Sequence, residues 1–165
     1  MIENASVQRV QDALAAVGGG HSVVALPQPA RTAAEAARAV GCRVEQIAKS
    51  LVFRGAQSQR AVLVVASGAN RVDELKVAGL LAEPIARADA DFVRAKTGYA
   101  IGGVPPIAHA EPLTILIDED LMQWPEIWAA AGHPNTVFKL TPDDLVRLTG
   151  GRVAAIKSGD STAVP

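Results

Sequence analysis

The sequence predicts an α+β fold, in which a mixed and partly barrel-like β-sheet is flanked by helices. The apolar runs at residues 50–53 and 61–65 are joined by a short segment that contains Gly55, which indicates a β-hairpin. Later apolar runs are separated by segments that carry helix-start signals. A sheet that combines hairpin-linked and helix-linked strands is typically mixed.

The first third of the chain predicts a helix, a strand and a second helix. Residues 5–17 place valine and leucine side chains at helical spacing, and three glycines follow. Residues 22–26 are expected to form a strand, which two nearby prolines stop. Thr32 is the expected N-cap of the next helix, because Glu35 follows in the capping-box pattern. This alanine-rich helix is expected to end at Gly41.

The middle of the chain predicts the central strands. Residues 44–48 are expected to add one helical turn before the hairpin. Both hairpin strands are continuously apolar, so both are expected to be buried on both faces. Residues 72–81 predict a helix whose inner side carries Leu75, Ala78 and Gly79. The next expected elements are a strand at 85–88 and a helix that begins at Asp89 or Asp91 and ends near Gly98.

The last third begins with a loop of glycine and proline at residues 99–108. After it we expect strands at 113–117, 136–140 and 152–156, and helices at 120–131 and 141–149. Thr141 is a strong helix start, because Pro142 and two aspartates follow it. We expect a single domain over residues 1–165, with residues 157–165 as a frayed tail.

The composition points to a soluble cytoplasmic protein. Cys42 is the one cysteine of the sequence, so it excludes an intramolecular disulfide and a cysteine metal cluster. The N-terminus lacks the basic and apolar pattern of a signal peptide, and no apolar run is long enough to span a membrane. We therefore expect no membrane partner and a reducing cytoplasmic location.

The charges are unevenly distributed along the chain. Residues 21–110 hold 11 Lys and Arg against 7 Asp and Glu, whereas residues 111–165 hold 4 against 8. The middle of the chain is thus where a phosphate group would be favoured. Scattered solvated charge explains the same numbers equally well, so this observation leaves both interpretations open.

Several common chemistries are missing from the sequence. It has no Gly-x-Ser-x-Gly elbow, no Walker A loop and no dinucleotide-binding glycine motif after a strand. Its histidines lie far apart without metal-ligand spacing; they are His21, His109 and His133. We therefore expect neither a metal site nor another cofactor.

Three features remain as candidates for chemistry. Lys49 precedes an apolar strand, where an ammonium can hold a phosphate or polarise a carbonyl; a lysine at the surface is the simpler alternative. Gly102 and Gly103 let backbone N–H groups approach a ligand, or they only form a tight turn. Residues 67–70 are a loop of small side chains that either lines a pocket or caps the next helix.

Taken together, these segments resemble the YbaK/ProX family of aminoacyl-tRNA editing deacylases. The matching segments occur in the family's order and cover roughly two thirds of the chain: residues 47–53, 61–68, 71–76, 97–99 with 102–106, 117–119 and 140–145. The resemblance implies a YbaK/ProX-like domain with a pocket between the lysine strand and the Gly-Pro loop. It also implies trans-editing: hydrolysis of a mischarged aminoacyl-tRNA, with tRNA for proline or a related tRNA as substrate.

The resemblance also assigns roles to residues. Lys49 would be the key lysine, and Gly102 and Gly103 would hold the ester and its water. The candidate substrate-binding residues are Ser67, Gly68, Asn70, Val104, Pro105, Pro106 and His109. The small or stiff residues around this pocket favour a small amino acid, and the expected partners are the acceptor end of mischarged tRNA and an aminoacyl-tRNA synthetase. The alternatives are a module that binds tRNA or a nucleotide without hydrolysing it, and a protein–protein adaptor.

Overall fold

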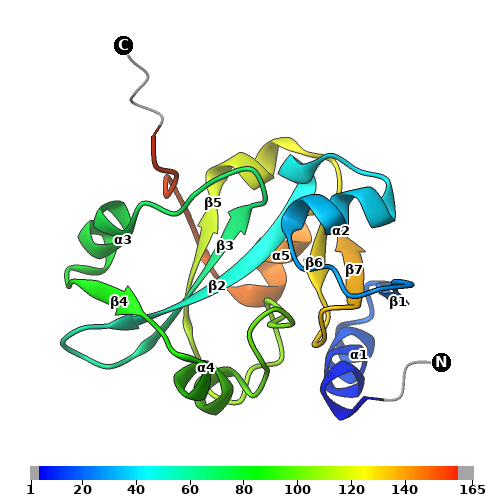
Figure 1. The fold of residues 1–165 in the computed structure, drawn as a ribbon, viewed down its shortest axis with the longest axis horizontal. Coiled ribbons are helices and arrows are strands. Elements are labelled where there is room, and N and C mark those ends of the chain that lie inside the picture. The colour runs from blue at the N-terminus through cyan, green and yellow to red at the C-terminus, as the bar shows by residue number, and fades with distance from the viewer. Residues whose placement is uncertain (1–3, 160–165) are drawn as a thin grey trace.

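The computed structural model describes residues 4–159, in which eight strands form one mixed sheet (Figure 1). The strands are β1 Val23–Ala25, β2 Ile47–Gly55, β3 Ala61–Ser67, β4 Ile85–Arg87, β5 Thr114–Asp118, β6 Ile127–Ala130, β7 Thr136–Leu140 and β8 Arg152–Ala154. The helices are α1 Ala5–Val17, α2 Ala33–Val40, α3 Glu74–Leu81, α4 Ala90–Thr97 and α5 Pro142–Thr149, with 3-10 turns η1 Val44–Gln46 and η2 Glu119–Gln123. The predicted α+β class and mixed sheet are confirmed.

The sheet is open, which corrects the expectation of a partly barrel-like sheet. Its strand order is β1-β7-β6-β2-β3-β5-β8, with β4 attached to β2 outside this path. The two end strands, β1 and β8, each pair with one neighbour and not with each other. The pairs β2–β6, β3–β5 and β5–β8 are parallel and the others are antiparallel.

Strand β2 changes its partner halfway along one edge. On one side it pairs with β3 without interruption, from Ala48 opposite Ser67 to Arg54 opposite Ala61, as the predicted hairpin requires. On the other side it pairs with β6 at residues 47–48 and with β4 at residues 53–55. Neither β6 nor β4 reaches residues 49–52, so the sheet splits there (Figure 1).

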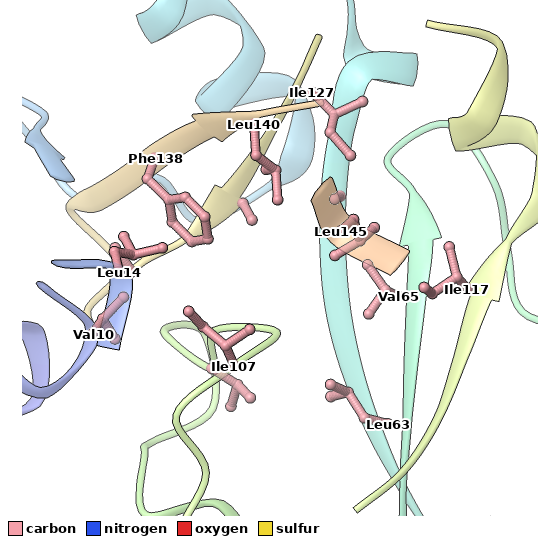
Figure 2. Close-up of a cluster of buried hydrophobic side chains, with 14 of the residues drawn as sticks. Val10, Leu14, Leu63, Val65, Ile107, Ile117, Ile127, Phe138, Leu140 and Leu145 are labelled. Atoms are coloured by element: carbon pink, nitrogen blue, oxygen red, sulfur yellow. The ribbon is translucent and has the colours of Figure 1, made fainter. Parts of the chain in front are cut away.

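The central strand β3 is buried along its whole length, as its continuous apolar sequence predicts. Its side chains alternate between two clusters. Leu63 and Val65 belong to the cluster that also contains Leu14 of α1 and Leu145 of α5, which Figure 2 shows. The alternate residues of β3 pack with Val77 of α3 in the second cluster. Strand β2 differs, because residues 49–52 are only partly buried beside the split.

Helix ends follow their sequence signals closely. The hydroxyls of Thr32 and Thr141 accept hydrogen bonds from main-chain N–H groups three residues later, at 3.1 and 3.0 Å. The carboxylate of Asp89, rather than that of Asp91, caps α4. Gly41 ends α2 in the left-handed conformation, as predicted.

Three local predictions are wrong. Residues 120–131 are not one helix: η2 ends at Gln123 and β6 begins at Ile127, because this segment is held by pairing with β7 and β2. The turn predicted for residues 44–48 ends at Gln46, since Ile47 already belongs to β2. Leu75 does not face the core but is 85% exposed; Val77 is the buried residue of α3.

The end of the chain remains attached to the body as far as it is described. Lys157 forms a bridge with Val72, and the N–H of Ser158 donates to the carbonyl of Arg71. Residues 160–165, most of the predicted tail, lie outside the described residues. Within residues 4–159, every helix is too short or too polar to cross a membrane.

Candidate functional site

Lys49 lies at the split in the sheet. It occupies the first residue of β2 beyond the pairing with β6, and Ala66 of β3 is opposite it. Its Nζ donates a hydrogen bond of 3.4 Å to the carbonyl of Gly68. Partial burial lowers the pKa of the Lys49 ammonium, the charge of Asp118 raises it, and that of Arg71 lowers it further. The ammonium is thus drawn toward the site rather than extended into solvent.

The loop at residues 99–108 lies over this split, and contacts of its first and last residues hold both of its ends. Tyr99 is fully buried, and its hydroxyl donates to the carbonyl of Ala108 at 2.8 Å. The guanidinium of Arg9 lies 4.4 Å from the centre of the Tyr99 ring and donates to the carbonyl of Gly98. These contacts hold the ends of the loop, and its residues Ile101, Gly102 and Val104 line the same pockets as β2.

The two glycines of the loop have different environments. Gly102 has φ +97° and lines the space beside Lys49, where an added Cβ would lie 3.6 Å from Pro134. Gly103 is buried, its N–H donates to the carbonyl of Ala100, and its carbonyl accepts from Gly132. A Cβ on Gly103 would lie 2.7 Å from the main chain of His133. Gly102 therefore faces the candidate site, whereas Gly103 supports the loop from behind.

Two pockets meet at this point. One has a volume of about 370 Å³ and extends toward α3 and β4; the other has about 590 Å³ and extends toward α2 and β6. Six residues border both pockets, namely Lys49, Ser50, Leu51, Ile101, Gly102 and Val104. The lysine strand and the glycine loop thus form one shared wall between two spaces.

The two pockets differ in character. Arg71, Arg87 and Glu74 line the first, beside apolar residues such as Phe53. The second is lined mostly by apolar residues, many of them alanine or glycine, together with Arg31 and Trp128. Both pockets are lined by arginine in addition to Lys49, which agrees with the positive middle of the sequence.

The small loop after β3 is tied to a buried carboxylate. Asp118 is fully buried, and its Oδ2 accepts from the N–H of Ser67 at 3.0 Å and from the side chain of Asn70 at 2.8 Å. Its Oδ1 accepts from the N–H of Asp120 at 2.9 Å. The Ser67 hydroxyl donates to the carbonyl of Glu45. Ser67 and Asn70 therefore position the loop that carries the Gly68 carbonyl, and Gly68 is the member of this loop that borders a pocket.

The remaining candidate residues are divided between the shared wall and a third pocket. Val104 is buried on the shared wall, whereas Pro106 and His109 line a third pocket of about 440 Å³ beside α5. The His109 Nε2 lies 2.7 Å from the carbonyl of Pro105, and burial lowers the pKa of the imidazole. The structure thus brings Lys49, Gly68, Gly102 and Val104 together, and it places His109 apart from them.

Some residues at the site have no local sequence pattern that identifies them as functional. In the sequence Asp118 stands out only as part of the segment 117–119, since nothing local shows that a carboxylate will be buried beside a lysine 69 positions earlier. Arg71 and Trp128 reach the pockets from different parts of the chain, the loop before α3 and β6. Among residues 4–159, no group of three or more His, Cys, Asp or Glu side chains is placed to hold a metal ion.

Comparison with known proteins gives the class of this chain. The aminoacyl-tRNA editing domain family matches residues 27–148, about three quarters of the sequence and the part that builds both pockets. The chain belongs to this family, as its resemblance to the YbaK/ProX proteins predicted.

Individual relatives agree with this assignment. A crystal structure described as that of "a putative trans-editing enzyme for prolyl tRNA synthetase" is 48% identical, with a TM-score of 0.90 over 96% of this chain and 100% of that one. Hypothetical protein APE2540 is 29% identical, with a TM-score of 0.84 over 91% and 99% of the two chains. YwhH of Bacillus subtilis, an uncharacterized protein, is 30% identical over 122 residues, which are 74% of this chain and 77% of YwhH.

Proposed function

We propose that this protein hydrolyses the ester bond of mischarged aminoacyl-tRNA. The observation that carries the proposal is the wall shared by two pockets, with Lys49 and Gly102 on it. An aminoacyl ester joins two unlike groups, an amino acid and a terminal nucleoside. With one group in each pocket, the ester carbonyl lies at the shared wall, beside the ammonium.

The proposed reaction is ester hydrolysis by water at the shared wall. Water attacks the ester carbonyl carbon, the bond to the ribose oxygen breaks, and the ribose oxygen takes a proton as the free amino acid forms. Negative charge develops on the carbonyl oxygen, and Lys49 is positioned to stabilise it. Gly102 leaves room for the ester to approach the main chain, while Gly103 holds the loop in place.

The attacking water also needs orientation. His109 lines a different pocket, so it is not the base in this proposal. Lys49 must be charged to stabilise an oxyanion, and an ammonium cannot accept a proton. The free hydroxyl on the terminal ribose neighbours the ester and can relay a proton or hold the water. In this proposal the substrate itself thereby supplies the group that orients the water.

The substrate we propose is a small amino acid on tRNA for proline or a related tRNA. Alanine and glycine residues border much of the second pocket, which suits a small amino acid, and Arg71 and Arg87 line the first, where they suit the phosphates of the acceptor end. The 48% identical structure described as that of "a putative trans-editing enzyme for prolyl tRNA synthetase" also favours this choice and a synthetase as partner.

A panel of mischarged tRNAs tests the proposal directly. Purified protein should release alanine, serine, threonine or cysteine faster than large aromatic amino acids. Lys49→Ala should lower the rate about 30- to 1000-fold, because one charge-assisted contact to the reacting carbonyl is lost. Lys96→Ala is the matched control, since Lys96 pairs with Glu111 away from both pockets.

Two alternatives are distinguished in the same assay. A module that only binds tRNA would retain the mischarged tRNA without releasing the amino acid. A protein–protein adaptor would show neither retention nor release. A Lys49→Ala variant with normal turnover would return Lys49 to the class of ordinary surface lysines and exclude the mechanism above.

A further inference from the structure

The split in the sheet leaves part of the edge of β2 without a strand partner. In an antiparallel pair, successive residues turn their main-chain N–H and C=O groups to opposite sides. The carbonyl of Ile47 and the N–H of Gly55 both bond toward the β3 side, whereas the N–H of Ala56 bonds to Pro84, on the β4 side. Odd-numbered residues of β2 thus face β3, and even-numbered ones face the outer edge.

This alternation places the main-chain groups of Ser50 and Val52 in the split. The registers of β6 and β4 end at Ala48 and begin again at Phe53, so neither strand reaches these two residues. Both residues border the first pocket, and Ser50 borders the second as well. The edge between the strands is therefore part of the pocket wall.

Ser50 also presents a side-chain group without a partner. Its Oγ is buried and makes no hydrogen bond among residues 4–159. A buried hydroxyl without a partner costs free energy unless a ligand or water satisfies it. Ser50 directly follows Lys49, about 3.3 Å further along the strand, and its side chain points to the opposite face of β2. A ligand that enters the split with its carbonyl at Lys49 would therefore bring its neighbouring atoms to the strand edge at Ser50.

We propose that this exposed edge of β2 binds the α-amino group of the aminoacyl ester, through the hydroxyl and carbonyl of Ser50. This inference rests on the proposed function. The α-amino nitrogen lies on the carbon next to the ester carbonyl, so it is the first polar group beyond Lys49. Charged or neutral, an amino group donates hydrogens, and the neutral acceptors of Ser50 suit it beside a cation. Val52 supplies a second carbonyl along the same edge.

The experiment is a thermodynamic cycle on two substrates. The first is the small aminoacyl-tRNA released fastest in the panel, and the second is the same tRNA bearing the matching 2-hydroxy acid, with OH in place of the amino group. Both are assayed with wild type, Ser50→Ala and Ser50→Cys. The difference in intrinsic ester reactivity cancels in the cycle. Ser22→Ala, an exposed serine outside both pockets, is the control.

We expect Ser50→Ala to lower kcat/KM about 10-fold on the aminoacyl substrate and less than about twofold on the hydroxy-acid substrate. Equal losses on both substrates, or no loss on either, would overturn the inference and leave the proposed function standing. Wild-type protein that releases neither substrate would instead refute the proposed function. Melting temperatures identify a folding defect, and Ser50→Cys repeats the test with a side chain of similar size.

Discussion

Replacing Asp118 should affect both stability and the electrostatics of the site. Its carboxylate is fully buried and accepts from two main-chain N–H groups, those of Ser67 and Asp120. Asp118→Ala leaves both donors without this acceptor, at about 1–3 kcal/mol each. The Asn70 side chain is less affected, because it also donates to the Asp120 side chain at 2.9 Å.

The size of the stability loss depends on how well water can replace the carboxylate as an acceptor. Ser67 is 1% exposed, so water cannot reach its N–H and nearly the full penalty for an unsatisfied donor applies. Asp120 lies nearer the surface, where water can reach its N–H. We expect a loss of about 3 kcal/mol for Asp118→Ala and a fall of about 6–12 °C in Tm for a chain of this size. Asp118→Asn keeps one acceptor oxygen and should lose about half as much.

The same change should shift the pH dependence of deacylation. The charge of Asp118 raises the pKa of Lys49, so its removal lets that pKa fall further. The ammonium form is then lost at a lower pH, and the alkaline limb of the rate profile should move to lower pH in Asp118→Asn. Rates are measured against pH beside thermal unfolding, with Asp12→Asn on the exposed face of α1 as control. A Tm within about 2 °C of wild type in Asp118→Ala, or an unshifted profile, would refute this reasoning.

Three further predictions concern the glycine loop, the hairpin and the substrate. Gly103→Ala should cost about 1–3 kcal/mol, because its Cβ meets the main chain of His133, and its Tm should fall while specific activity is retained. A Cβ at Gly102 has open space, so Gly102→Ala costs only backbone strain of about 1 kcal/mol. The specific activity of this variant should therefore fall while its Tm changes little. Hydrogen bonds from the N–H and hydroxyl of Ser58 lower the pKa of Glu83 from its ordinary value of 4.5 to about 2. The free energy of unfolding should therefore decrease as the pH falls from 4.5 to about 2, and Glu83→Gln should make this decrease smaller. Mischarged tRNA that lacks the terminal ribose hydroxyl beside the ester should bind normally but hydrolyse at least about 100-fold more slowly, and equal rates would show that the protein carries its own base.

Local sequence determined the elements whose signals are self-contained. The run at residues 61–65 is apolar at every position and rich in β-branched valine, which favours a strand buried on both faces, and β3 is such a strand. Thr32 and Thr141 cap helices because a hydroxyl at the N-cap satisfies an N–H three residues later, an interaction within one turn. The ordered family motifs predicted the editing-domain family, and the roles assigned to Lys49 and Gly102 stay predictions.

Tertiary structure alone decided the features that depend on residues far apart in the chain. Residues 127–130 became β6 rather than helix because β7 and the start of β2 offered strand partners, and a short apolar run suits either state. Asp118 lies 69 positions after Lys49, yet parallel pairing of β5 with β3 brings its charge to the loop that accepts from Lys49. The split beside Ser50 exists because β6 and β4 pair with different ends of one strand. Such pairing is set by the packing of the whole sheet, and no local pattern in β2 records it.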